Sequence, residues 1–236
     1  FVNIERYRLS AFNDSFTGTA ATDYSYGAEG DDTLSGAAGV DRLYGQDGID
    51  TLNGDAGNDI LIGGTGADML NGGADRDTAS YETMTVGVTI NLASGVHTGD
   101  ATGDTFNSIE ILWLTAFNDT FTGGNAVDEV RGNDGVDTLN GGGGADILRG
   151  ENGADILNGD AGDDILDGGA GADAMNGGAD TDYASYLLAT AGVTINLTTN
   201  THTGEAAGDT FTAIERFQLS NGFTLIDTFT GSAGDR

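Results

Sequence analysis

Apolar residues recur along this chain every nine positions, which differs from the spacing of ordinary amphipathic strands and helices. Reading from Gly27 gives GAEGDDTLS, GAAGVDRLY, GQDGIDTLN, GDAGNDILI and GGTGADMLN, each with an apolar eighth residue. Each unit divides into a six-residue loop rich in Gly and Asp and a three-residue segment with an apolar centre. Because neighbouring side chains of a strand point to opposite faces, this segment predicts a short strand with its middle residue buried.

The nine-residue units form two blocks of eight units each, over residues 9–80 and 114–185. The sixth residue is Asp in all sixteen units, and the eighth is apolar in fifteen, Ser25 being the exception. A longer period of 105 residues relates the blocks, since VTINL at 88–92 recurs at 193–197. The chain is therefore two copies of one unit followed by the beginning of a third.

Counting in nines divides the chain into six segments. These are 1–8, the end of a preceding linker coil; 9–80, the first block; 81–113, linker coils; 114–185, the second block; 186–221, linker coils; and 222–236, the start of a third block. We expect the linkers to continue the coils with altered loops, because Asp104 and Phe106 return in phase. Phe1 falls inside a repeat, so we expect a longer parent chain.

Two units make one coil of eighteen residues, and stacked coils build two parallel sheets about 4.8 Å from strand to strand. We therefore predict an all-β fold, a parallel β-roll or β-solenoid with two stacked sheets around a thin core of Leu and Ile. Glycine at the first and fourth positions of each unit is expected to adopt positive φ and to turn loop carbonyls inward.

Stacking aligns the sixth-position Asp residues in one row along each edge of a block. The rows are Asp14, Asp32, Asp50, Asp68 and Asp23, Asp41, Asp59, Asp77 in the first block, and Asp119, Asp137, Asp155, Asp173 and Asp128, Asp146, Asp164, Asp182 in the second. Adjacent carboxylates would repel by roughly 1 kcal/mol in water and by a few at an effective dielectric near 20. A hard dication between each pair, bound also by loop carbonyls, would reverse that sign.

Composition favours Ca²⁺ as this cation. The chain carries 38 Asp plus Glu against 8 basic residues, for a net charge of −30, with no Cys and 2 His. Flexible, all-oxygen coordination favours Ca²⁺ over Mg²⁺, and the lack of Cys disfavours Zn²⁺. One ion for each stacked pair gives about six per block. One buried apolar side chain in nine residues offsets little of the conformational entropy, so the metal is predicted to decide folding.

The same composition excludes several function classes. The strong negative charge argues against nucleic acid and anionic lipid, and no stretch is apolar enough for membrane insertion. The chain has no Lys for a phosphate-binding loop, and no HExxH or GxSxG motif. We predict no catalytic residue and no enzyme activity for this chain by itself.

These units resemble the GGxGxDxUx nonapeptide of the RTX (repeat-in-toxin) family. The resemblance implies a right-handed β-roll, Ca²⁺ held between stacked loops, export by a bacterial type I secretion system and folding outside the cell. The linker pattern VTINL…GDTF…IE…AFNDTFTG looks like that of long surface and adhesin-type members. Departures at the fourth position, Ala21, Ala126, Asp75 and Asp180, imply weaker sites at the block ends.

Some residues keep two readings. The row Asp residues could merely cap turns, although sixteen in phase favour calcium. Asp104, Asp209 and Asp227 are in phase without the full motif, and Arg236 stands where the last unit should have its Asp. His97 and His202 are equivalent across copies in polar loops, where a ligand role is the minor reading.

The middle Ile-Glu strand differs from its counterparts. It has Ile111 and Trp113 where the first copy has Arg6 and Arg8. Leu112 is expected to face the core, so this pair is expected to face outward, where it would contact a partner or another subunit. Cover by a neighbouring loop is the competing reading.

The function predicted from these features is a calcium-binding secreted structural module, such as a spacer or a surface-layer, adhesin or fibre segment. It would lie outside the cell or on its surface. The alternative is the β-roll region of a secreted RTX enzyme or toxin whose catalytic domain lies elsewhere. An ice-binding solenoid would need an outward row of Thr, which the seventh positions do not supply: they read Tyr24, Thr33, Arg42, Thr51, Ile60, Met69.

Overall fold

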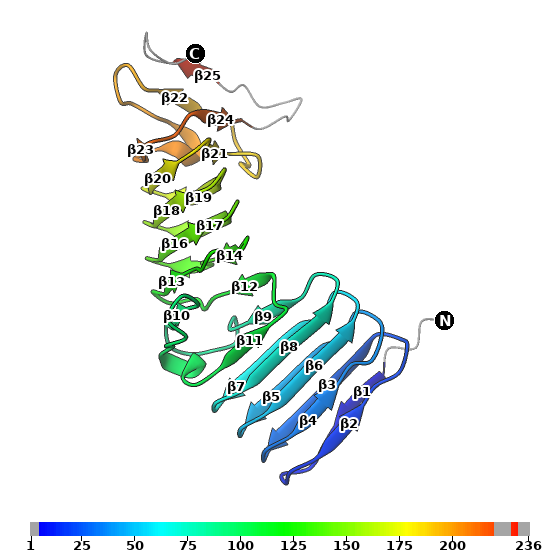
Figure 1. Ribbon diagram of the computed structural model, residues 1–236. Coiled ribbons are helices and arrows are strands. Elements are labelled where there is room, and N and C mark those ends of the chain that lie inside the picture. The colour runs from blue at the N-terminus through cyan, green and yellow to red at the C-terminus, as the bar shows by residue number, and fades with distance from the viewer. Residues whose placement is uncertain (1–4, 220–227, 231–236) are drawn as a thin grey trace. The chain divides into compact units, whose positions relative to one another are not determined.

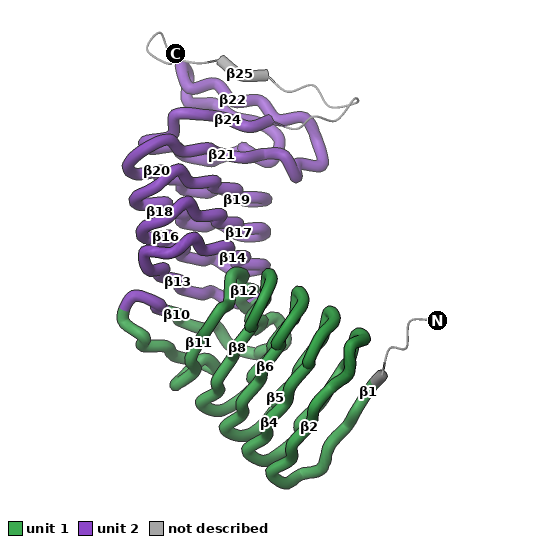
Figure 2. The backbone as a smooth tube through the Cα atoms, turned by 45° about the vertical axis from the view of Figure 1, so that its right-hand side comes forward, with its two compact units in different colours: residues 1–90, 94–115 green, residues 91–93, 116–236 purple. Residues whose placement is uncertain are grey.

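The computed structural model describes residues 5–219 and 228–230. The chain forms two compact units, coloured separately in Figure 2. Unit 1 comprises residues 1–90 and 94–115, and unit 2 comprises residues 91–93 and 116–236. Among the described residues, no helix is long and apolar enough to cross a membrane.

Unit 1 stacks parallel strands in two sheets (Figure 1). The first sheet has the order β1 (Glu5–Arg8), β3 (Asp23–Glu29), β5 (Arg42–Asp47), β7 (Ile60–Thr65), β9 (Thr78–Ser80) and β12 (Ile111–Trp113). The second has the order β2 (Ser15–Thr17), β4 (Thr33–Ser35), β6 (Thr51–Ala56), β8 (Met69–Ala74) and β11 (Thr105–Asn107). The linker adds β10 (Thr89–Asn91) and the 3₁₀ helix η1 (Gly99–Ala101).

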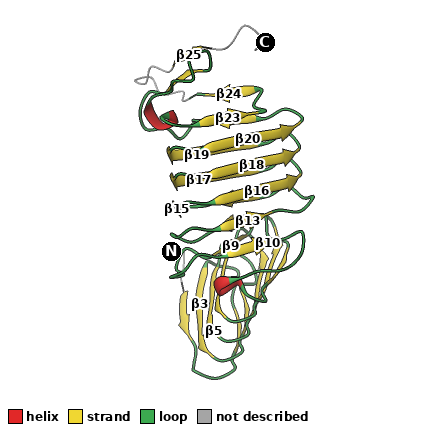
Figure 3. Cartoon of the chain, turned by 90° about the vertical axis from the view of Figure 1, so that its left-hand side faces the viewer, coloured by secondary structure: helices red, strands yellow, loops and turns green. Residues whose placement is uncertain are grey.

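Unit 2 repeats this arrangement, and Figure 3 shows its strands stacked one above another. One sheet has the order β14 (Glu129–Arg131), β17 (Ile147–Gly153), β19 (Ile165–Gly171), β21 (Tyr183–Ser185) and β24 (Arg216–Gln218), with β15 (Asp134–Gly135) also on β17. The other has the order β13 (Thr120–Thr122), β16 (Thr138–Gly143), β18 (Ile156–Ala161), β20 (Ala174–Ala179) and β23 (Thr210–Thr212). The 3₁₀ helix η2 (Gly204–Ala206) precedes β23.

Within each block, a residue pairs with the residue one coil of eighteen later. Leu34 lies opposite Leu52 in the second sheet, and Leu43 lies opposite Leu61 in the first. All four side chains are 0% exposed, as is Ser25, the one polar eighth-position residue. The core is therefore one row of apolar side chains from each sheet. The predicted all-β parallel solenoid is confirmed.

The linkers differ from the continuous coil expected there. In unit 1, β11 pairs directly with β8, so that Phe106 lies opposite Leu70. Residues 81–98 are an excursion that adds no strand between β8 and β11, and within it Thr89 and Thr98 form an antiparallel bridge. Because the excursion has the length of one coil, the nine-residue count stays in phase across it. Counting residues therefore does not distinguish a loop of that length from another coil.

Unit 2 has the same excursion at residues 186–203, since β23 pairs directly with β20. The strand β22 (Thr194–Asn196) of this excursion pairs in parallel with β25 (Thr228–Thr230). The rest of the predicted third block, with Asp227 and Arg236, lies outside the described residues, as do residues 1–4 of the first linker segment.

The Ile111 and Trp113 pair is half-buried, whereas we expected it to be exposed. Leu112 between them is 4% exposed and faces the core as expected. Trp113 lies opposite Ser80 and Ile111 opposite Thr78, and these two neighbours are 5% and 4% exposed. The chain's own residues therefore cover this side of the sheet.

Candidate metal-binding edges

The sixth-position Asp residues form hydrogen-bonded rows along the edges of each block. Each Asp in a row donates its backbone N–H to Oδ1 of the Asp one coil later. Asp41 N–H donates to Asp59 Oδ1 at 2.7 Å, and Asp146 N–H donates to Asp164 Oδ1 at 2.8 Å. Every Asp directly precedes a strand, except Asp23, which is the first residue of β3, so the pairing of the strands fixes the row. Asp41 and Asp59 are 0% and 1% exposed.

The second carboxylate oxygen, Oδ2, is buried without a hydrogen-bond partner in the inner units of both blocks. This holds for twelve residues: Asp32, Asp41, Asp50, Asp59, Asp68, Asp77, Asp137, Asp146, Asp155, Asp164, Asp173 and Asp182. A buried carboxylate oxygen without a partner is costly in a folded protein. A cation, a proton or a hydrogen-bond donor beside these twelve oxygens would therefore stabilise the fold.

Backbone oxygens face the same spaces. A Cβ built on Gly45 would lie within 3.0 Å of both Asp50 Oδ2 and the carbonyl oxygen of Gly63 in the next coil. Gly150 has the same relation to Asp155 and to the next coil. The first-position glycine is thus required because a side chain would fill the space between oxygens of two coils.

The inner units also share a backbone conformation at their second position. Positive φ occurs there in the same twelve units whose Oδ2 has no partner: at Ala28, Ala37, Gln46, Asp55, Gly64, Gly73, Asn133, Gly142, Glu151, Asp160, Gly169 and Gly178. This conformation rotates the preceding peptide unit, which directs the first-position carbonyl toward the previous coil.

The prediction of positive φ is therefore wrong for the first position and correct for most fourth-position glycines, Gly153 and Gly171 being the exceptions. Gly48 and Gly66, at the fourth position, have φ of 149° and 142°. Gly45, at the first, lies outside the left-handed range, and its neighbour Gln46 has φ of 82° instead. The first position is glycine because no space is left for a side chain, and not because the backbone there has positive φ.

This donor set fits Ca²⁺. Each inner space combines an unpaired carboxylate oxygen with backbone carbonyl oxygen, and Ca²⁺ prefers such hard, irregular oxygen sites. Across residues 5–219 and 228–230, no three Asp, Glu or His side chains converge on one point. Backbone carbonyls must therefore supply part of the coordination, which suits calcium and not a zinc site.

A comparison with protein families agrees with this donor set. The model of the RTX calcium-binding nonapeptide repeat matches four stretches, 17–52, 44–79, 113–148 and 149–184, which together cover more than half of the chain. The chain belongs to the RTX calcium-binding nonapeptide repeat family. No curated protein matches the chain. The RTX repeats thus form a β-solenoid that is a calcium-binding structural module.

The first two RTX units of each block close their loops differently from the inner ones. Asp14 Oδ2 accepts the Ser10 N–H at 2.7 Å, and Asp23 Oδ2 accepts the Thr19 N–H at 2.6 Å. Asp128 likewise accepts an N–H from its own loop. These three predicted ligands therefore already have a donor on the oxygen that the inner units leave unpaired. Asp119, the remaining first-unit Asp, donates its N–H to Asp137 Oδ1 at 2.8 Å.

Burial raises the pKa of the inner RTX carboxyl groups in the metal-free chain. Burial raises the pKa of Asp59 to about 7, partly offset by the Asp41 N–H and reinforced by the Asp41 and Asp77 carboxylates. The pKa of Asp137 in the second block is raised to about 7, again mainly by burial. Without a cation, protons would therefore compete for these oxygens close to neutral pH.

Sequence reasoning missed the residues that follow each RTX block. Tyr81 donates its hydroxyl to Asp104 Oδ2 at 2.5 Å, and Glu110 Oε2 accepts the Asp77 N–H at 2.9 Å. Their only sequence signal is recurrence 105 residues later, as Tyr186 and Glu215. The contacts span 23 and 33 residues, so the nine-residue period does not indicate them.

The two histidines pack against aromatic rings. His97 is 7% exposed and meets Phe106 edge-on at 5.3 Å between ring centroids. His202 meets Phe211 in the same way at 5.2 Å. Burial lowers the pKa of both imidazoles, so the neutral form is favoured. Both histidines lie in loops as expected, where each ring packs against a phenylalanine and His202 Nδ1 also accepts the Asn196 N–H at 3.2 Å.

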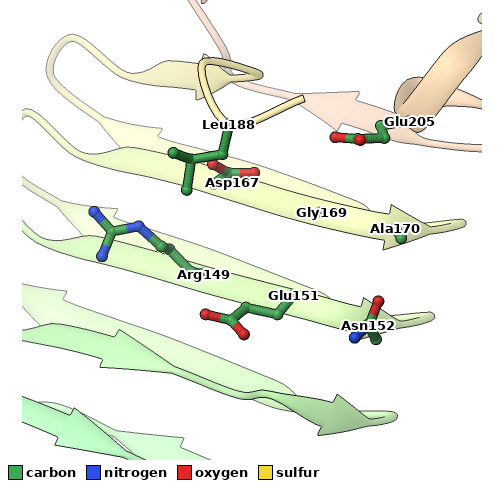
Figure 4. A pocket seen from close by; sticks show the side chains of 8 residues that line it. All are labelled: Arg149, Glu151, Asn152, Asp167, Gly169, Ala170, Leu188 and Glu205. Carbon is green, nitrogen blue, oxygen red and sulfur yellow. The ribbon is translucent and has the colours of Figure 1, made fainter. Parts of the chain in front are cut away.

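Both units carry a pocket on the outer face of the first sheet, lined partly by second-position residues of the edge loops. In unit 2 its volume is about 260 Å³, and its lining includes Arg149, Asp167 and Glu205 (Figure 4). In unit 1 its volume is about 330 Å³, and its lining includes Tyr44 and Ile62, which lie 105 residues before Arg149 and Asp167. The position of the pocket is therefore repeated after 105 residues, whereas the side chains that line it change from aromatic and apolar to charged.

Proposed function

We propose that this chain is an extracellular spacer that calcium stiffens, as a segment of a bacterial adhesin, surface layer or fibre. The observation that carries the proposal is the set of twelve buried, unpaired Oδ2 atoms, each in a unit with positive φ at its second position. A cation at each of these places would join two coils. The assignment of Asp32, Asp50, Asp137 and the other inner row residues as calcium ligands belongs to this proposal.

Six inner Asp residues per block support the expected number of about six ions per block. Each ion would neutralise carboxylates that otherwise repel along the row. Stacks joined in this way resist both bending and unfolding, because separating two coils also breaks metal ligands. A module of this kind separates functional domains without needing a site of its own.

Secretion by a type I system and folding outside the cell complete the proposal. Calcium-dependent folding suits such a route, because a chain that is unfolded where calcium is scarce stays competent for export and folds on arrival. The net charge of −30 supports an extended chain in the absence of calcium. We do not extend the proposal to a partner contact through Ile111 and Trp113, because both are half-buried.

The second candidate function is the β-roll region of a secreted enzyme or toxin. The RTX match favours it equally, because the repeats do not distinguish the two. The gene sequence on both sides of the chain separates them. Further 105-residue units support the spacer, and a catalytic domain supports the enzyme.

Single-molecule pulling tests the spacer proposal directly. In calcium, each block of 72 residues (9–80 and 114–185) should unfold in its own force peak and release roughly 250 Å of chain. With EGTA the same chain should extend without peaks. Unfolding peaks of equal force in both buffers would refute the proposal.

A further inference from the structure

The rows of Asp residues continue for one step beyond the last nine-residue unit. Asp104 Oδ1 accepts the Asp68 N–H at 2.8 Å, although the two residues are 36 positions apart. Asp209 Oδ1 accepts the Asp173 N–H at 2.9 Å in the same way. These linker carboxylates therefore occupy the next place in the row, directly after the excursion.

Their second oxygen, however, has a donor from the protein. Tyr81 donates its hydroxyl to Asp104 Oδ2 at 2.5 Å, and Tyr186 donates to Asp209 Oδ2 at 2.5 Å. Both tyrosines are 1% exposed. Tyr81 is also anchored by its backbone, since its N–H donates to the Trp113 carbonyl at 2.8 Å. The hydroxyl thus satisfies the oxygen that is unpaired in every inner unit.

The opposite row ends on a different side chain. Asp77 donates its N–H to Glu110 Oε2 at 2.9 Å, and Asp182 donates to Glu215 Oε2 at 2.9 Å. The Glu110 N–H in turn donates to the Asp77 carbonyl at 3.2 Å. The carboxylate of Glu110 or Glu215 thus accepts the last N–H of this row, and no further glycine–aspartate loop is needed there.

We infer that Tyr81 and Tyr186 terminate the calcium rows, taking the place that a cation would have beside Asp104 and Asp209. A neutral hydroxyl satisfies one carboxylate oxygen, whereas a dication would need further oxygen ligands. At Gly45 the space beside Asp50 Oδ2 also contains a carbonyl oxygen of the next coil, whereas a Cβ on Gly99, the first residue of the Asp104 unit, would first meet Gly87 and Val88 of the excursion. Each linker coil is consequently fixed to its block without metal.

This inference rests on the proposed calcium sites, and one map tests both. Crystals of the whole chain grown in calcium would be measured at a long X-ray wavelength, where calcium scatters anomalously. We expect peaks beside Asp50 Oδ2 and Asp59 Oδ2 and none beside Asp104 Oδ2. A peak beside Asp104 overturns the termination by tyrosine. Absence of the peaks beside Asp50 and Asp59 instead overturns the proposed sites themselves.

Tyr81→Phe gives a second test in solution, with Tyr44→Phe as the matched control. Tyr44 stacks on Tyr26 on the outer face of the same unit, so its variant also loses one hydroxyl. We expect Tyr81→Phe to raise the calcium concentration at the folding midpoint several-fold, and Tyr44→Phe to leave it unchanged. Equal midpoints for the two variants would contradict the inference. If Tyr81→Phe does not fold, the anomalous map of the unaltered chain decides.

Discussion

The two RTX blocks have the same edges and different outer faces. At the edges, each has six inner units with an unpaired Asp oxygen and positive φ at the second position. On the outer face of the first sheet, Tyr44 and Ile62 of the first block are replaced by Arg149 and Asp167 in the second. The edge admits little variation, because backbone and carboxylate oxygens fill it from both coils.

The outer faces show how much freedom the same stack leaves elsewhere. In unit 1, Tyr26 and Tyr44 stack with their ring centroids 4.5 Å apart and their planes at 8°. In unit 2, Arg149 instead forms an ion pair with Glu129 at 2.5 Å. Strands of the same register support both arrangements, because the core needs only the middle residue of each strand. The outer-face side chains can therefore diverge between copies while the edges stay constant.

Adding a methyl group at the edge should have the largest effect, and the same effect in both blocks. In Gly45→Ala and Gly150→Ala the new Cβ would clash with Asp Oδ2 and with the carbonyl of the next coil. We expect each variant to lose bound calcium and about 3 kcal/mol of block stability. Gly124→Ala is the control, since its Cβ would have no neighbour within 4 Å.

Equilibrium dialysis and urea unfolding at saturating calcium measure these changes. A Gly45→Ala chain that binds as much calcium as the Gly124→Ala chain would show that the first-position space is not part of a metal site. A large difference between Gly45→Ala and Gly150→Ala would break the equivalence of the two edges.

Acid should partly replace calcium, and in the same pH range for both blocks. Burial raises the pKa of Asp59, Asp68 and Asp137 to about 7 in the folded chain without metal, from 3.8 when unfolded. Because the folded pKa is raised, protonation stabilises the fold, and that stability is lost as the pH rises through about 7. We expect strand content in EGTA to increase as the pH falls from about 8 to about 5.

Circular dichroism in EGTA follows this change, and calcium affinity should fall over the same interval as protons compete. The Asp59→Asn variant, which carries no charge at this position, should show a smaller dependence on pH. Identical spectra at both ends of the range would contradict the account of the edge carboxylates.

Exchanging the outer-face residues should have a smaller effect, confined to one block. Burial raises the pKa of Asp167 to about 6, partly offset by Arg149 and reinforced by Glu205. The stability tied to its protonation is lost as the pH rises through about 6, so ionised Asp167 costs roughly 2–3 kcal/mol at neutral pH. We expect Asp167→Ile to stabilise the second block at pH 7 and to leave calcium binding unchanged.

The reciprocal Ile62→Asp variant should destabilise the first block by a similar amount, because Ile62 is 6% exposed. Urea unfolding at pH 7 and at pH 5 checks both variants, and the gain from Asp167→Ile should shrink at the lower pH. A loss of bound calcium in either variant would show that edge and outer face are coupled.

Much of the fold follows from the sequence, because one residue in nine has a fixed role. Leu34 and Leu52 stack because the chain returns to the same sheet after eighteen residues, as the nine-residue period predicts. The excursion at 81–98 was mistaken for a coil because a loop of eighteen residues preserves the phase. Only its lack of glycine–aspartate loops distinguishes the excursion from a coil, and counting residues does not detect that lack.

The candidate site was predictable where it repeats and not where it ends. The period predicts the rows of Asp residues. It does not predict which Oδ2 atoms have a hydrogen-bond donor, because that depends on local peptide orientation. Asp23 and Asp41 occupy equivalent positions in sequence, yet Asp23 accepts the Thr19 N–H and Asp41 does not. The nine-residue period does not indicate the contact of Tyr81, because its partner Asp104 lies 23 residues away.

Calcium-dependent folding is the central claim, in which cations join adjacent coils along each edge of a thin solenoid. Far-ultraviolet circular dichroism of the purified chain at pH 7.5–8, titrated with calcium from an EGTA buffer, tests this directly. We predict an unordered spectrum in EGTA and a cooperative change to a strand-rich spectrum as calcium rises, with reversal on adding chelator. A strand-rich spectrum of full amplitude in excess EGTA would contradict the account.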